Sequence, residues 1–429
     1  MQITARGLET HTRMLTDTIG VRLAGSPQER RAAEYLAAEF RKYSSRVDIL
    51  EYPVRERAVD AEKLEVEIDG VYREYPASLF SSAPSTGGEV REAELVWFDT
   101  ATGYQRPDLS MLGGKAVVHL GCHIESEENY RRLMAADPEF ILFTDTRYPG
   151  TIPLADGLFP AYVKKYGAVP SLNVAYMDVW QWAKRSAARA RIRISGGVRE
   201  SRTTVVVCEI PGSDPGAGVI YAGGHHDTQA GTVGADDNAI GSAAVVELAR
   251  ILAAAPHRRT LRLISFGAEE QLSWGSACYV RQFQREIREN GIFMCNFDTF
   301  GSAVGWAEHT LNTNAALEEL ITSVFHRNGI YFVRSAAPCP YTDQFPFAAC
   351  GVPGIWIYRK NCAAGTFYHH RADNDAEVID FRQSARQVCA AAQLLSELAD
   401  REDISAFRGI PAALQQRIDE GFRTVYGGF

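Results

Sequence analysis

The sequence predicts an α/β fold with a mostly parallel central sheet and helices on both of its faces. From about residue 203, strand patterns alternate with helix patterns, which is typical of parallel strands joined by helices. The strand at 218–224 (GVIYAGG) is almost wholly apolar, as expected of a strand buried on both faces. Residues 61–194 differ, because short β-like runs alternate there with Gly, Pro and Ser turns, and they predict a separate, β-rich inserted domain.

Hydrophobic periodicity places the elements of the α/β part. An amphipathic helix is predicted at 27–43 and a strand at 46–54. Further strands are predicted at 203–210, 218–224, 261–268, 291–297 and 351–358, and helices at 238–255, 275–290, 315–329 and 381–399. We therefore expect one discontinuous catalytic domain, residues 1–60 and 195–429, interrupted by the insertion at 61–194. The amphipathic tail at 399–429 has no site signature, and a subunit contact is one use for it, so we expect a homo-oligomer.

Composition narrows the classes of partner. The 429 residues carry a net charge of −8, which argues against binding to nucleic acid or to an anionic membrane surface. No apolar run approaches the ~20 residues of a membrane span, and the first residues lack the apolar core of a signal peptide. The eight cysteines are scattered without a CxxC pair, so we expect buried thiols and a cytoplasmic protein.

Acidic and histidine side chains follow the ends of four predicted strands, at the edge where open α/β sheets bind ligands. These residues are His225, Asp227, Asp237, Glu269, Glu270, Asp298, His369 and His370. Carboxylates gathered at one place repel each other, and the flanking segments offer few basic residues to neutralise them. Divalent cations would do so, and a mixed set of His, Asp and Glu suits Zn²⁺ or a similar first-row metal better than Ca²⁺.

Six motifs in this order resemble the co-catalytic zinc aminopeptidases, a peptidase family that also contains glutaminyl cyclases and glutamate carboxypeptidases. The motifs, over roughly 200–390, are GGHHDT, GADDNAIGSAAVVELAR, FGAEEQLSWGSACYV, NFDTFG, YTDQFPFAACGVPGIWI and YHHRADND. The insertion resembles the protease-associated domain that many members carry. The resemblance implies one or two divalent metal ions, with zinc the first choice and manganese or cobalt as alternatives.

The resemblance also implies a role for each site residue. The metal ligands would be His225, Asp237, Glu270, Asp298 and His369, with Asp237 bridging two ions. Asp227 would orient the imidazole of His225, and Glu269 would be the general base. Tyr368 is a candidate donor of a hydrogen bond to a developing oxyanion.

Neighbouring residues compete for some of these roles. The family places its last histidine four residues before an aspartate, so Asp373 selects His369 over His370. We expect His226 and His370 to be bystanders or substrate contacts. Asp236 is expected to be a loop acid or to support the site from behind the ligands, and the same two alternatives stand open for Asp343 in YTDQFPF.

Departures from the family motifs leave two substrate classes open. His370 and Arg371 follow the last histidine where the peptidases have Ser or Thr, and the surrounding loops also bring Arg334, Arg359 and Lys360. A basic rim suits a substrate carboxylate, whereas an aminopeptidase must hold an ammonium. The first hypothesis is an intracellular aminopeptidase or dipeptidase acting on small peptides. The alternative is an aminohydrolase or amidohydrolase of a small anionic molecule, such as a nitroanthranilate-like aromatic amine, with Arg334 and Arg371 as substrate contacts. A non-enzymatic binding protein is disfavoured because every metal and base position is filled.

Overall fold

A computed structural model describes residues 3–335, 337–362 and 365–429 and divides the chain into two compact units. Unit 1 comprises Met1–Val54, Ser201–His369 and Asp373–Phe429, and unit 2 comprises Arg55–Glu200 and His370–Ala372. The divisions fall inside two long strands, β1 (Arg46–Ile68) and β8 (Arg189–Ile210), which therefore give residues to both units.

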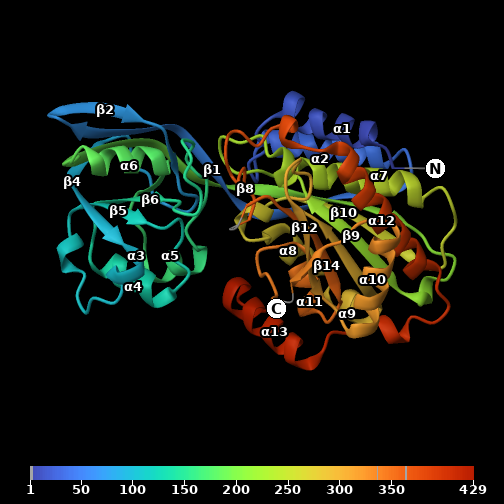
Figure 1. Ribbon diagram of the computed structural model, residues 1–429. Coiled ribbons are helices and arrows are strands. Elements are labelled where there is room, and N and C mark those ends of the chain that lie inside the picture. The colour runs from blue at the N-terminus through green and yellow to red at the C-terminus, as the bar shows by residue number, and fades with distance from the viewer. Residues whose placement is uncertain (1–2, 336, 363–364) are drawn as a thin grey trace. The chain divides into compact units, whose positions relative to one another are not determined.

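The central sheet of unit 1 is mostly parallel, which confirms the predicted fold class (Figure 1). Its strand order is β13-β12-β14-β11-β9-β10-β8. The four middle strands β14, β11, β9 and β10 run parallel, and β12 and β8 pair with them in the antiparallel sense. The strand bounds are β9 (Val219–His225), β10 (Thr260–Phe266), β11 (Gly291–Phe297), β12 (Trp306–Asn312), β13 (Val333–Ser335) and β14 (Gly354–Lys360).

Both faces of this sheet are buried. Successive residues of a strand point to opposite sides, so each strand contributes apolar side chains to both faces. Along β9, Ile220 and Ala222 join one apolar cluster, and Val219 and Tyr221 join another. The first cluster is covered by α1 (Ala5–Arg13), α2 (Pro27–Phe40), α7 (Ile240–Leu252), α10 (Ala315–Arg327) and α12 (Phe381–Asp400). The second is covered by α8 (Trp274–Gln282), α9 (Gln284–Asn290) and α11 (Gln344–Ala349). The apolar strand sequences follow from this double burial.

Two elements near the N-terminus differ from the sequence prediction. Helix α1 was not predicted; the Thr4 side chain caps it by accepting a hydrogen bond from the Gly7 amide at 3.0 Å. Strand β1 continues well past the predicted end at residue 54 and pairs with β2 (Val71–Tyr75).

Unit 2 contains a parallel arrangement of β4 (Val90–Asp99), β5 (Ala116–Leu120), β6 (Phe140–Thr144) and β7 (Ser171–Val174), and β3 (Ala77–Leu79) pairs antiparallel with β7. The unit also has helices that the β-rich reading did not predict. They are α3 (Thr100–Gly103), α4 (Glu127–Ala135), α5 (Pro160–Tyr166) and α6 (Tyr176–Lys184). Helix α4 opens with acidic residues directly after the N-cap residue Ser126. A serine followed by acids is a signal for the start of a helix, and it was missed in the sequence. Likeness to a protease-associated domain stays a prediction.

The C-terminal tail folds back onto unit 1. Helix α13 (Ala412–Tyr426) buries Ile418 and Phe422 against Ala277 of α8 and Phe345 of α11. The apolar side chains of this face are covered by their own chain, so they do not support the expected subunit contact, which stays a prediction. The homo-oligomer loses that support and stays a prediction.

Every helix among the described residues is too short or too polar to cross a bilayer.

A buried carboxylate ties α2 to the sheet. Glu29 is 1% exposed, and its Oε1 accepts hydrogen bonds from the Thr203 hydroxyl at 2.7 Å and the Thr204 amide at 2.9 Å. Its Oε2 accepts one from the Gly25 amide at 2.6 Å. Glu29 follows the N-cap residue Ser26, so one acid stabilises both the helix start and the contact with β8.

Glu29→Gln is expected to lower the free energy of unfolding by about 1–3 kcal/mol, because the amide group faces a backbone N–H that has lost its acceptor. Denaturant unfolding followed by tryptophan fluorescence measures the change. Glu34→Gln on the exposed side of the same helix is the matched control and should stay within about 0.5 kcal/mol of the parent. Equal stabilities of the two variants would contradict this role of Glu29.

Candidate metal centre

Parallel strands bring the predicted site residues to one edge of the sheet. His225 ends β9 and is in register with Phe266, the last residue of β10. Asp298 follows directly after the end of β11, the other neighbour of β9. Glu269 and Glu270 lie in the 3-10 turn Glu269–Gln271, which two residues separate from the end of β10. Carboxyl ends of adjacent parallel strands thus supply an imidazole and three carboxylates to one place.

His225 is the centre of this group and is completely buried. Its Nε2 lies 3.1 Å from Asp237 Oδ1, 3.6 Å from Asp298 Oδ1 and 3.8 Å from Glu269 Oε2. Burial lowers the pKa of His225, but the neighbouring carboxylates, Asp298 first, outweigh this and raise it well above its ordinary value. The surrounding carboxylates therefore strongly stabilise a positive charge at this site.

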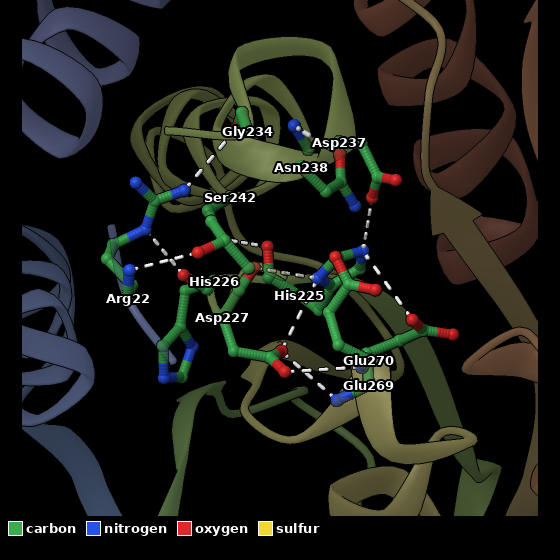
Figure 2. Close-up of polar contacts among 12 residues, drawn as sticks. Arg22, His225, His226, Asp227, Gly234, Asp237, Asn238, Ser242, Glu269 and Glu270 are labelled. Carbon is green, nitrogen blue, oxygen red and sulfur yellow. Dashed lines mark hydrogen bonds and ion pairs between the residues drawn. The ribbon is translucent and has the colours of Figure 1, made fainter. Parts of the chain in front are cut away.

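Asp227 fixes the orientation of this imidazole and of the acidic turn (Figure 2). One of its carboxylate oxygens lies 3.4 Å from His225 Nδ1. The same carboxylate accepts hydrogen bonds from the amides of Glu269 at 3.0 Å and Glu270 at 3.2 Å. This geometry is compatible with the orienting role predicted for Asp227. The same buried acid also joins the end of β9 to the turn after β10.

Asp237 presents its two oxygens to two different histidines. Its Oδ1 lies 3.1 Å from His225 Nε2, and its Oδ2 lies 3.5 Å from His369 Nε2. The backbone of Asp237 is non-helical (φ −125°, ψ 83°), so the residue stands outside the regular turns of α7. Gly234 makes room for this loop: its φ is +53°, and a Cβ there would meet the Asp237 carbonyl oxygen at 2.1 Å.

The turn that carries Glu269 and Glu270 is held in a strained conformation. Ala268, Leu272 and Ser273 all have φ between 49° and 61°, in the left-handed region that side chains other than glycine seldom adopt. The Ser273 hydroxyl donates to Glu269 Oε1 at 2.8 Å. Burial raises the pKa of Glu269 well above its usual value, although nearby His225 lowers it.

These residues fit a divalent metal centre. Potential ligand atoms of His225, Asp237 and Glu270 lie within 4.8 Å of one another. His225 Nε2 is buried and makes no hydrogen bond within the described part of the chain, although it faces only acidic oxygens at short range. Imidazole nitrogen with carboxylate oxygens is a donor set for zinc and for neighbouring first-row metals, and it can hold one or two such ions.

Arg22 is a buried cation that the sequence analysis missed. Its guanidinium donates to the carbonyls of His226 at 2.6 Å, Val233 at 2.9 Å and Gly234 at 3.4 Å, the loop between β9 and Asp237 (Figure 2). Burial lowers the pKa of Arg22 to about 10, against the raising effect of acids led by Asp227. Its charge offsets part of the acidic surplus, and its hydrogen bonds fix the loop that separates two predicted ligands.

Two further buried acids surround the predicted ligands. Asp236 Oδ1 accepts a hydrogen bond from the Gly301 amide at 2.6 Å, and burial raises the pKa of Asp236 to about 7. It supports the loop after β11, in line with the supporting role expected of it. Burial likewise raises the pKa of Asp343 to about 7, against a lowering by His225. Asp343 is completely buried in the turn that opens α11, so both expected readings, a turn acid and an acid that supports the site, stay open.

The surroundings of His226 bear on its two expected roles. It is completely buried, and its Nδ1 lies 2.9 Å from Ser265 Oγ while its Nε2 lies 3.2 Å from Thr204 Oγ1. Its ring therefore belongs to the same buried network as Glu29, which is 3.4 Å away. This burial favours the bystander alternative over a substrate contact, and the ring of His226 points away from that of His225 because successive residues of an extended segment point to opposite sides.

The basic residues expected to form a rim that binds a substrate anion have acidic or carbonyl partners instead. Arg334 lies on the edge strand β13 and pairs with Glu318 of α10 at 2.7 Å. In unit 2, Arg371 is 3% exposed and pairs with Asp145 at 3.0 Å. Lys360 pairs with Glu308 at 3.3 Å, and Arg359 donates to the Ser302 carbonyl at 2.6 Å. These contacts remove the main support for Arg334 and Arg371 as anion-binding residues.

Tyr368 and His370 flank His369 in the chain. The Tyr368 ring packs edge-on against Phe367, with centroids 5.5 Å apart. His370 has a φ of 56° and belongs to unit 2, where its carbonyl accepts a hydrogen bond from the Ala155 amide at 2.8 Å. Their proposed contacts with an oxyanion or substrate stay predictions.

Comparisons with known proteins agree with the site. Residues 205–393, which contain all five predicted ligands, match the model of peptidase family M28. The aminopeptidase YwaD of Bacillus subtilis is 22% identical over 289 residues, 67% of this chain and 60% of its own length. The chain thus spans less than two thirds of that relative.

Two solved structures share the fold. The zinc aminopeptidase BSAP from Bacillus subtilis aligns with a TM-score of 0.76 and 18% identity, over 95% of this chain and 98% of its own. A peptidase M28 precursor from Shewanella amazonensis aligns with a TM-score of 0.80 and 19% identity, over 94% and 95%. With these shared folds, the comparisons support the resemblance seen in the sequence: the segment that carries the predicted ligands, residues 205–393, matches peptidase family M28.

Proposed function

We propose that this protein is a metal-dependent aminopeptidase that removes the N-terminal residue from short peptides, including dipeptides. The observation that carries the proposal is the position of Asp237, whose two oxygens face His225 and His369 at the sheet edge beside Glu269. Relatives that are named aminopeptidases support the choice of reaction.

The ligand roles follow from the geometry. We assign His225, Asp237, Glu270, Asp298 and His369 to hold one or two divalent ions, zinc first, with Asp237 shared between them. Bound ions would act as Lewis acids and lower the pKa of a water molecule at the site.

Glu269 is suited to move the proton in this reaction. Its Oε2 faces the ligand His225 at 3.8 Å, and its Oε1 is fixed by the Ser273 hydroxyl at 2.8 Å. Because burial raises the pKa of Glu269, its carboxylate is a better proton acceptor than an exposed one and can take a proton from water and return it to the leaving nitrogen.

The electrostatics favour a substrate ammonium over a substrate anion. Acidic side chains outnumber cations among the buried residues around His225, where the charge of Arg22 offsets part of the acidic surplus. The basic residues once expected to attract an anionic amine are engaged in ion pairs or backbone hydrogen bonds. Among the residues that the structure describes, these contacts do not favour the aminohydrolase alternative.

A substrate panel tests the proposal. Zinc-loaded protein is expected to release amino acids from dipeptides and aminoacyl anilides, and N-acetylated versions of the same substrates should be poor because they lack the ammonium. Ammonia release from small aromatic amines is measured in parallel. Ammonia release without cleavage of any aminoacyl substrate would overturn the aminopeptidase assignment.

Glu269→Gln is expected to lower kcat by about 10²–10⁴ because the amide cannot accept a proton. Metal content by elemental analysis should match that of the parent protein. Glu289→Gln, on the exposed end of α9, serves as the control and should keep parental kcat. Near-normal turnover by Glu269→Gln with full metal content would refute the role of general base.

The adjacent aspartates offer a matched test of the metal centre. Asp237→Asn should reduce the metal bound per chain after dialysis, because one of the two oxygens that face the histidines becomes an amide. Asp236→Asn should retain the parental metal content, since its carboxyl instead accepts a hydrogen bond from a backbone amide, a bond that Asn preserves. Chelation of the parent should lower its thermal midpoint as the carboxylates are left to repel each other. Equal metal content in the two variants would contradict the assignment.

A further inference from the structure

The buried side chain of Asn374 joins two loops of unit 1 that adjoin predicted metal ligands. Asn374 follows His369 by five residues and is 1% exposed. Its Oδ1 accepts a hydrogen bond from the backbone amide of Asp236 at 2.7 Å, and its own carbonyl accepts one from the amide of Ala235 at 3.0 Å. One residue of the segment after His369 thus holds two consecutive amides of the loop that leads to Asp237.

Asp236 extends this contact to a third loop, the one after β11. Its Oδ1 accepts a hydrogen bond from the Gly301 amide at 2.6 Å, and Gly301 lies shortly after the predicted ligand Asp298. A Cβ at Gly301 would lie 2.8 Å from the Ile379 side chain and 3.1 Å from Asp236 Oδ1. The absence of a side chain at this position therefore allows the two loops to approach each other closely.

Backbone hydrogen bonds connect the loop after β11 with the segment that follows Asn374. The Ala303 amide donates to the Val378 carbonyl at 2.8 Å, and the Asp380 amide donates to the Gly301 carbonyl, also at 2.8 Å. Each of the three loops is therefore hydrogen-bonded to the other two. We call this set of hydrogen bonds, among residues 235–236, 301–303 and 374–380, the loop network.

The loop network lies next to the residue whose position the metal centre depends on. Asp237 follows Asp236 directly, and its two oxygens lie 3.1 Å from His225 Nε2 and 3.5 Å from His369 Nε2. His225 belongs to β9, whereas His369 lies in a turn. The sheet thus fixes the first histidine, and contacts between loops must fix Asp237 relative to the second. A zinc site tolerates errors of only about 0.2 Å in ligand distance, so this spacing controls affinity.

We propose that Asn374 is a positioning residue for the metal centre, which acts through the backbone amide of Asp236 to hold Asp237 at the spacing from His369 that allows one ion to bind both. This inference rests on the proposed function for the ligand roles of Asp237 and His369. It extends the metal centre to a neutral side chain outside the predicted ligand set, and it explains why that side chain is buried behind an acidic site.

Zinc titration of the full-length, metal-free protein in competition with a chromophoric chelator tests the inference. Asn374→Ala removes the Oδ1 acceptor, and we expect the Kd of the more weakly bound zinc to rise about 10-fold, the lower end of the effect of residues that support metal ligands. Asn374→Asp keeps an oxygen at the same place and should return the Kd to within about threefold of the parent.

Asn314→Ala is the matched control, because it removes a hydrogen bond of the same kind. The Asn314 side chain accepts from the Leu317 amide at 3.0 Å at the start of α10. It follows Asn312, the end of β12, which is in register with Gly354 at the start of β14, so it lies at the opposite edge of the sheet from the site. This variant should have a lower thermal midpoint but the parental zinc Kd.

Amide hydrogen exchange of the metal-free protein supplies a second readout. Asn374→Ala should increase exchange at 234–239, while β9 and β10 keep their protection. If the Asn374→Ala protein does not fold, Asp236→Ala takes its place, since it removes the other side-chain acceptor of the loop network and should weaken zinc binding in the same way.

A parental zinc Kd in Asn374→Ala, or in Asp236→Ala where that variant replaces it, would overturn the inference. An equal loss of zinc affinity in Asn314→Ala would also overturn it, because the effect would then reflect general stability. If the parent binds zinc but cleaves no aminoacyl substrate, the proposed reaction is refuted, and the zinc titration still decides the role of Asn374.

Discussion

The structure of unit 1 around β9 depends on the electrostatics of several carboxylates packed against one buried imidazole. His225 lies within 3.8 Å of oxygens from Asp237, Asp298 and Glu269, and water is excluded from its ring. Such a group of acids is unfavourable in a protein interior unless protons or cations neutralise it. Arg22 supplies one positive charge, and divalent ions at the site would supply the rest.

Residues other than the predicted ligands help to hold these acids in place. Parallel strands fix the starting points, Asp227 joins the ends of β9 and β10, and Arg22 fixes the loop that leads to Asp237. Three residues with left-handed backbone conformations shape the turn of Glu269. The strain is concentrated where a proton acceptor is needed, which is a frequent feature of functional sites.

The sequence was sufficient to predict the sheet and the residues at its edge, because buried parallel strands are apolar runs and the acids and histidines follow their ends. It was not sufficient for contacts that have no local pattern. Arg22 binds backbone carbonyls, so no acidic partner in the sequence revealed it. His226 differs from His225 only in the direction of its side chain. Arg334 and Arg371 looked available as an anion-binding rim because Glu318 and Asp145, their partners, are distant in sequence. The packing of α13 likewise required the tertiary structure.

The most direct measurement for the central claim is anomalous diffraction at the zinc absorption edge from crystals of the zinc-loaded protein. The account predicts one or two peaks at bonding distance from Asp237, about 2.0–2.2 Å from its oxygens, on the sides that face His225 and His369. Zinc bound only elsewhere, with the Asp237 carboxylate unligated at full loading, would contradict it.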